Sequence, residues 1–127
     1  EECKDIAARL ESYRKENRFV VHSHSFWNSV YHFWELPDDI RIHLESCSCT
    51  IVKGDANYRR LVGDCKWRTT IPFSDLTPFF PKPFLSLRTM KSDAVVGLPD
   101  GLEKELDDAD PEWRVNGKRG VIQFVKA

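Results

Sequence analysis

The sequence predicts an α/β domain with a parallel or mixed sheet and helices on both of its faces. Three apolar, β-leaning segments, residues 47–53, 84–89 and 120–126, are separated by stretches of helical character. Such alternation is typical of α/β folds. The 127 residues are 41% apolar and 12% aromatic, which suffices for the core of one domain and argues against bulk disorder.

The N-terminal third contains two helix signals and one strand signal. Residues 4–16 place apolar side chains at helical spacing among charges, which predicts an amphipathic leading helix within residues 1–16. The run RFVVH, residues 18–22, predicts a short strand, and an aromatic-rich span follows it. Pro37, followed by two aspartates, suits the first turn of a second helix that continues to about residue 46.

The remainder of the chain predicts a strand–glycine–helix unit, residues 47–63, followed by shorter segments. Residues 47–53 are the best strand candidate, and the helix after Gly54 ends near residue 63. Four prolines make residues 72–83 a loop with room for one helical turn at residues 74–79. We further expect extended backbone at residues 66–71, 84–89 and 95–98, an acidic helix at 101–108, and a final strand at 120–126.

Charge and hydropathy argue against two classes of partner. With 19 basic and 20 acidic residues the formal net charge is −1, so no basic field favours nucleic acid and no polybasic run marks a membrane surface. No apolar stretch approaches about eighteen residues, and no signal peptide is recognisable. The chain opens on Glu1 without an initiator Met, as a fragment or a cleaved product would. We expect a cytoplasmic location that extends to the nucleus.

The junction between the predicted strand and the helix after it is the most informative segment. A glycine elbow before a helix N-terminus presents free backbone N–H groups and the positive end of the helix dipole, which together favour an anion. Lys53 and Arg59 add a point charge and a planar fork that suit phosphate. The alternative is a plain connection in which Asp55 caps the helix, Tyr58 belongs to the core and the charges are solvated.

Two other clusters permit different hypotheses. A tetrahedral zinc site has candidate donors in His22, His24, Cys47 and Cys49. Because no C-x-x-C pair is present, we favour reduced cysteines, and a packing and hydrogen-bonding role for the two histidines. The aromatic cluster around Trp27 and Trp34 lacks interleaved basic residues, which favours core packing over stacking on nucleobases.

Two motifs resemble the signatures of one protein family. The string IVKGDANYRRLVGDCKW, residues 51–67, closely resembles the signature of the metal-dependent damage-control phosphatases, one branch of which is also called acidic residue methyltransferase. That branch carries a second motif, Arg-Thr-any-Lys, a little over thirty residues downstream, which here reads Arg88-Thr89-Met90-Lys91. HSHSFW (residues 22–27) and GKRGVIQF (residues 117–124) add to the resemblance, which covers nearly the whole chain from about residue 15 onward.

The resemblance implies a fold and an activity. The fold is a Rossmann-like three-layer α/β/α sandwich, of which residues 1–127 would be the C-terminal part. In such sheets the ligand lies outside the carboxyl ends of the strands, which is where residues 47–63 place the first motif. The activity is hydrolysis of a small phosphorylated metabolite, such as fructose 1-phosphate or fructose 6-phosphate, with manganese, nickel or cobalt as the divalent metal.

The resemblance also implies roles for individual residues. The family's substrate-contacting segment corresponds to Asp55, Ala56, Asn57, Tyr58 and Arg59, and Lys91 matches its substrate-contacting lysine. Arg59 and Lys91 would neutralise phosphate charge, Asn57 would orient the ligand and Tyr58 would wall the pocket. Asp55 would act as general acid/base or hold a metal-bound water. We also expect Lys53, Gly54 and Arg88 to contact the substrate.

One departure from the family pattern concerns the metal. The family holds it with an Asp-Asn pair and a further Asp upstream of the Lys-Gly-Asp motif, and this chain has no Asp-Asn pair. We therefore expect no metal ligands in this chain, ligands in the N-terminal segment or chain of the same protein, and no activity from this chain alone. The alternatives are an S-adenosylmethionine-dependent protein glutamate carboxyl methyltransferase and a non-catalytic α/β module that binds a phosphorylated ligand.

Overall fold

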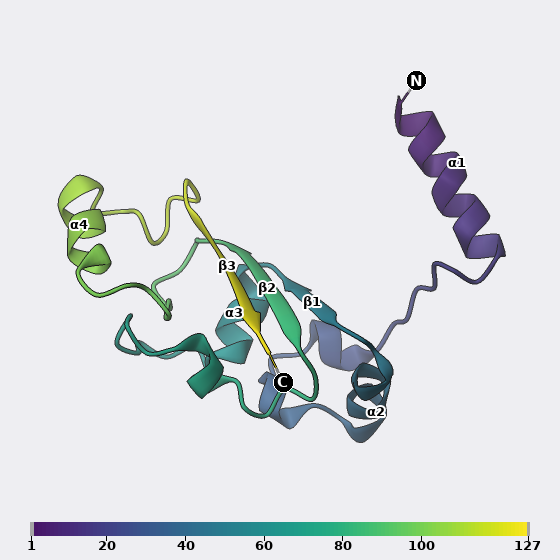
Figure 1. Cartoon of the computed structure of the whole chain (residues 1–127), viewed down its shortest axis with the longest axis horizontal. Helices are drawn as coiled ribbons and strands as arrows, with labels where there is room; N and C mark the ends of the chain where they lie inside the picture. Colours follow the sequence, from purple (N-terminus) through teal and green to yellow (C-terminus); the bar gives the residue numbers. More distant parts are fainter. Residues whose placement is uncertain (1, 127) are drawn as a thin grey trace.

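A three-stranded mixed sheet organises the chain. In the computed structural model, which describes residues 2–126, the strands β1 (Thr50–Lys53), β2 (Phe84–Thr89) and β3 (Gly120–Val125) lie in the order β1-β2-β3 (Figure 1). β1 runs parallel to β2, with Lys53 opposite Leu87. β3 runs antiparallel to β2, with Thr89 opposite Gly120. The predicted α/β class with a mixed sheet is therefore confirmed.

Helices connect and flank these strands. They are α1 (Glu2–Lys15), α2 (Asp38–Ser46), α3 (Asp55–Leu61) and α4 (Leu102–Ala109), with short 3-10 turns at Ser25–Asn28, Phe33–Glu35 and Phe73–Leu76. Each predicted helix is present. Figure 1 shows α1 standing apart from the rest of the chain and α4 at the opposite end. None of the helices in this described part is long and apolar enough to cross a membrane.

Three predicted extended segments do not form strands. Residues 18–22 lie outside the sheet, and Val20 and Val21 remain exposed because no neighbouring strand pairs with them. Residues 66–71 and 95–98 contact each other instead, since the Gly97 N–H donates to the Ile71 carbonyl at 2.8 Å. β1 begins only at Thr50 because Cys47 still caps α2, with its N–H donating to the Leu44 carbonyl.

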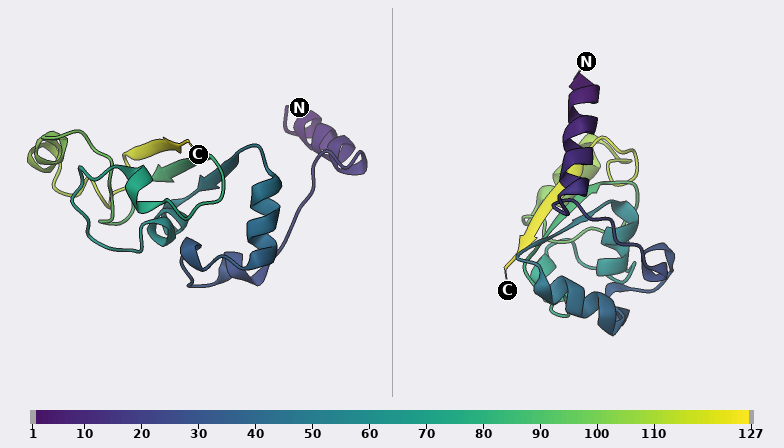
Figure 2. Two further views of the ribbon diagram at one scale, coloured as in Figure 1. Left: turned by 60° about the horizontal axis from the view of Figure 1, so that its bottom comes forward. Right: turned by 90° about the vertical axis from the view of Figure 1, so that its right-hand side faces the viewer.

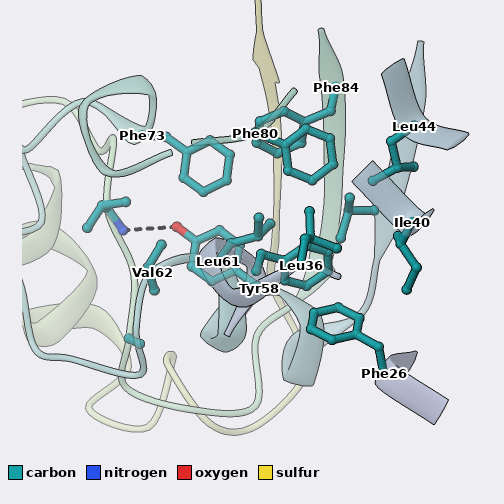
Figure 3. Close-up of a cluster of buried hydrophobic side chains, with 14 residues drawn as sticks. Phe26, Leu36, Ile40, Leu44, Tyr58, Leu61, Val62, Phe73, Phe80 and Phe84 are labelled. Carbon is teal, nitrogen blue, oxygen red and sulfur yellow. Dashed lines mark hydrogen bonds between the residues drawn. The ribbon is translucent and has the colours of Figure 1, made fainter. Parts of the chain in front are cut away.

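The main core lies between α3 and one face of the sheet (Figure 3). Tyr58 and Leu61 are three residues apart, share one side of α3 and are 0% exposed, as is Phe84 of β2. The Tyr58 ring stacks on Phe73 at 5.3 Å between centroids, and its hydroxyl accepts a hydrogen bond from the Val96 N–H at 3.2 Å. Figure 3 shows this bond at the edge of the cluster.

The aromatic span before α2 contributes two phenylalanines to this core. Phe26 and Phe33 are buried, whereas Trp27 and Trp34 are 38% and 45% exposed. Arg60 of α3 holds the span in place, because its guanidinium donates to the carbonyls of Phe26, Trp27 and Tyr31. The prediction of core packing is therefore confirmed for Phe26 and Phe33 and is wrong for Trp27 and Trp34, which are exposed.

The opposite face of the sheet is apolar and open. Ile51 of β1 and Ile122 and Phe124 of β3 are 63%, 77% and 60% exposed. Figure 2 shows α3 on one side of the strands, and no helix of residues 2–126 packs on the other side. Helices on both faces, as the sequence predicted, are therefore not present within residues 2–126.

Candidate functional site

A cleft of about 470 Å³ opens at the carboxyl ends of β1 and β2. Because these strands are parallel, both chain segments leave the sheet at the same edge. The lining residues are Lys53, Gly54, Asp55, Leu87, Arg88, Thr89, Lys91, Gly120, Val121 and Ile122. The structure thus brings parts of the two sequence motifs into one cavity.

Gly54 forms the turn that directs the chain from β1 into α3. Its backbone has φ 106° and ψ 156°, a region in which only glycine is common. The Gly54 N–H donates to the Leu87 carbonyl at 2.8 Å, while its own carbonyl accepts the first helical bond from Tyr58. α3 spans only seven residues, and its first position holds the acidic Asp55, so its N-terminus adds little attraction for an anion.

Asp55 points to the end of β2 and does not cap α3. Gly54 is the N-cap and makes no side-chain capping bond, which contradicts the alternative that Asp55 caps the helix. Oδ1 of Asp55 accepts hydrogen bonds from Arg88 Nε at 2.8 Å, from Ser92 Oγ at 3.1 Å and from the Lys91 N–H at 3.2 Å. Within residues 2–126, Oδ2 has no such bond, so it is the oxygen left to meet a ligand.

Arg88 is the buried centre of this network. Its side chain is 0% exposed, whereas that of Asp55 is 15% exposed. Besides Asp55, its guanidinium donates to the Ala94 carbonyl and to the carbonyl and hydroxyl of Ser92. The guanidinium carbon also lies 4.3 Å above the centre of the Tyr58 ring. These donors serve protein acceptors, so the expected contact between Arg88 and a substrate is not what the structure supports.

The second motif alternates between the core and the cleft. Arg88 and Met90 are buried, and Thr89 and Lys91 are exposed at the cleft. Met90 is 1% exposed and packs in a small cluster with Val95 and Trp113. The Trp113 indole N–H donates to Asp107 of α4 at 2.7 Å, so a hydrogen bond connects this cluster to α4. The backbone next to Lys91 is therefore anchored by two buried side chains, Arg88 and Met90.

Four of the substrate contacts predicted in the first motif lie outside the cleft. Ala56 is exposed, and Asn57 donates from its amide to the Lys53 carbonyl at 2.9 Å. Tyr58 is buried beneath Arg88, so the alternative of a core residue describes it, and burial raises the pKa of its hydroxyl. Arg59 pairs with Asp64, Nε to Oδ1 at 2.6 Å, and this hydrogen bonding lowers the pKa of Asp64.

Ser92 and the supporting role of Met90 were not predicted from the sequence. Ser92 Oγ lies between Arg88 and Asp55, close enough to bond with both. Its position directly after the second motif was the available signal. Met90 was visible as the apolar member of an alternating run that follows β2, but the Trp113 cluster around it joins residues that the sequence keeps more than twenty positions apart.

The alternative metal site is absent from the described chain. Within residues 2–126, no group of three or more His, Cys, Asp or Glu side chains is placed to hold a metal ion. His24 accepts the Phe26 N–H on Nδ1 at 3.0 Å, so a neutral His24 carries its own proton on Nε2, which faces Asp39 at 3.4 Å. The zinc hypothesis is therefore wrong, and the hydrogen-bonding role of His24 is the one observed.

The chain is similar to known proteins of one family. Residues 1–106 match the damage-control phosphatase ARMT1-like domain. Proteins named damage-control phosphatase ARMT1 are similar to the chain: one from Xenopus laevis is 41% identical over 114 residues, and one from Rattus norvegicus is 38% identical over 128 residues. These alignments cover 87% and 98% of this chain, but only 26% and 29% of the two relatives. The chain thus spans about a quarter of the length of the curated relatives that it matches.

Proposed function

The chain belongs to the damage-control phosphatase ARMT1-like family, as its two motifs predicted, and from this premise we propose that it forms one wall of a phosphatase site. The observation that carries the proposal is the cleft at the carboxyl ends of β1 and β2. There Asp55, fixed through Oδ1, shares one cavity with Lys53 and Lys91. The reaction is hydrolysis of a small phosphate ester in a house-cleaning role, with fructose 1-phosphate and fructose 6-phosphate as candidate substrates.

Four polar residues of the cleft have direct roles in this proposed reaction. Lys53 and Lys91 are exposed cations at the cleft, and they neutralise charge on the non-bridging phosphate oxygens. Oδ2 of Asp55 exchanges a proton with the attacking water or the leaving oxygen, because Oδ1 is already engaged by three donors. Thr89 of β2 also lines the cleft and supplies a hydroxyl to it.

The residues described here do not form a metal cradle. Asp55 lines the cleft and keeps one carboxylate oxygen without a hydrogen bond among residues 2–126, and no group of three metal ligands is formed there. We therefore assign the divalent metal, manganese, nickel or cobalt, to ligands in the N-terminal segment or chain of the same protein. That ion would stabilise charge on the phosphate, while this chain supplies the two lysines and Asp55.

The open face of the sheet supports a three-layer sandwich in the whole protein. Ile51, Ile122 and Phe124 are each more than half exposed on one continuous sheet surface. Apolar surface gains roughly 25 cal/mol for each Å² removed from water, so a helical layer packed on this face would stabilise the fold. We assign that layer to the same N-terminal segment, which would bring its metal ligands next to the cleft.

The test is phosphate release by the longest native polypeptide that contains this sequence. Fructose 1-phosphate is supplied with manganese, nickel or cobalt, and a chelator serves as the control. We expect metal-dependent release of phosphate. Binding of the ester without release would favour the non-catalytic module, and methyl transfer from S-adenosylmethionine without hydrolysis would favour the methyltransferase; either result overturns the proposal.

A further inference from the structure

We propose that Arg88 is a positioning residue that acts through Asp55, an inference that rests on the proposed function because it takes Asp55 as the reacting carboxylate. Arg88 is buried, and its Nε lies 2.8 Å from Oδ1 of Asp55. It holds one oxygen of the carboxylate so that the other is presented to the cleft. Arg88 itself contacts neither the substrate nor the reacting atoms.

The geometry around Arg88 leaves its guanidinium little freedom. Its terminal nitrogens donate to the Ala94 carbonyl and to the carbonyl and hydroxyl of Ser92, and its flat face lies 4.3 Å over the Tyr58 ring. A planar fork fixed at three points sets the direction in which Nε donates. Asp55 therefore receives a hydrogen bond of defined direction rather than a mobile counter-charge.

Ser92 completes this arrangement. Its hydroxyl lies 2.8 Å from Arg88 Nη2 and 3.1 Å from Oδ1 of Asp55, so one hydroxyl bridges the two charged groups. The Lys91 N–H adds a third donor to the same oxygen at 3.2 Å. All four groups belong to the two sequence motifs or adjoin them, and together they fix the carboxylate relative to the backbone of Lys91.

A purely structural role for Arg88 makes a different prediction, and Arg60 provides the matched control. Arg60 is also an arginine that joins distant segments, because it donates to the carbonyls of Phe26, Trp27 and Tyr31 and lies over the rings of Phe26 and Phe33. Arg60 makes no bond to Asp55 among the described residues. Replacing either arginine removes a structural tie, but only replacement of Arg88 releases Asp55.

The first experiment measures the side-chain rotamer of Asp55 from NMR scalar couplings in the 127-residue chain. The variants are Arg88→Lys, which keeps the charge and loses the fork, and Arg60→Lys as the control; Arg88→Met replaces Arg88→Lys if the latter does not fold. We expect one χ1 rotamer in the wild type and in Arg60→Lys, and averaging over rotamers in the Arg88 variant. A single rotamer in all three proteins would overturn the proposal.

The second experiment measures hydrolysis of fructose 1-phosphate by the longest native polypeptide that contains this sequence. We expect Arg88→Lys to lower kcat about ten- to a hundredfold with little change in KM, and to change kcat less than about twofold in an Asp55→Asn background. An equal loss in both backgrounds would mean a structural role. If the wild type does not hydrolyse the ester, the proposed function fails, while the rotamer measurement still decides whether Arg88 positions Asp55.

Discussion

Nε of Arg88 donates a hydrogen bond to Oδ1 of Asp55 at 2.8 Å, and this bond joins β2 to the first residue of α3. The two residues are 33 positions apart in the sequence and belong to different motifs. Their contact makes the motifs one structural unit, with Lys91 attached to it through its backbone N–H. A substitution of Asp55 or Arg88 is therefore expected to alter the structure of both motifs.

Lys91→Ala should lower activity without destabilising the protein. Lys91 is exposed at the cleft, so the substitution should change the free energy of unfolding by less than about 0.5 kcal/mol. Because it removes a cation that neutralises phosphate charge, kcat/KM should fall about a hundred- to a thousandfold.

The matched control for this lysine is Lys104→Ala. Lys104 is likewise exposed, but it lies on α4 and pairs with Asp108. Steady-state kinetics and chemical denaturation of both variants check the prediction. Equal kcat/KM for the Lys91 and Lys104 variants would contradict the role of Lys91.

Gly54→Asn should destabilise the protein through backbone strain alone. At φ 106° and ψ 156° Gly54 occupies a region that asparagine does not tolerate, and a Cβ there would meet open space. The expected loss is about 1 to 3 kcal/mol of unfolding free energy. Gly101 at φ 81° and ψ −23° also has open space around it, but asparagine adopts that left-handed conformation readily.

Thermal or chemical denaturation of Gly54→Asn and Gly101→Asn compares the two glycines. We expect the Gly101 variant to remain within about 0.5 kcal/mol of the wild type. Similar losses in both variants would show that the unusual backbone of Gly54 is not the cause.

The pair formed by Arg59 and Asp64 should make a pH-dependent contribution to stability. Hydrogen bonds from Arg59 lower the pKa of Asp64 in the folded protein. A lowered folded-state pKa stabilises the fold above the unfolded pKa of about 3.9, and the contribution disappears as the pH falls through the folded value. Asp64→Asn suits the backbone at φ 52°, because asparagine tolerates positive φ.

The expected effect of Asp64→Asn is small, because both side chains are more than 40% exposed. It should lower the free energy of unfolding by at most about 1 kcal/mol at pH 7. Urea denaturation at pH 7, 5 and 2.5 should show this difference shrinking towards zero at the lowest pH. A difference that is as large at pH 2.5 as at pH 7 would rule out the ion pair as its source.

The sequence predicted where helices form better than it predicted which extended segments pair into a sheet. Pro37 and the two aspartates after it located α2, and the acidic run after Gly101 located α4, because each signal lies within a few residues of sequence. Residues 18–22 have the composition of a strand, yet a strand forms only where another strand pairs with it, and none does so here. Local pattern cannot supply that information.

For single residues of the site, too, the local sequence pattern did not predict which groups each side chain contacts. The sequence predicted the junction at Gly54 and named Asp55, Lys53 and Lys91 as site residues, and these residues line one cleft in the structure. Whether a charged side chain faces the cleft or bonds to another protein group depends on the three-dimensional placement of its partners, which the local sequence pattern does not give. Arg88 is buried against Asp55, and Arg59 pairs with Asp64, although both arginines suit a phosphate equally well by their chemistry.

Replacing Asp55 by asparagine tests whether the cleft beside β1 and β2 is a phosphatase site. Asn keeps an oxygen that accepts the hydrogen bond of Arg88, so the fold should persist, but it cannot exchange a proton. In the longest native polypeptide that contains this sequence, kcat for fructose 1-phosphate should fall by about a hundredfold or more while the circular dichroism spectrum stays unchanged. A folded Asp55→Asn protein that hydrolyses the ester at the wild-type rate would contradict the assignment of the site.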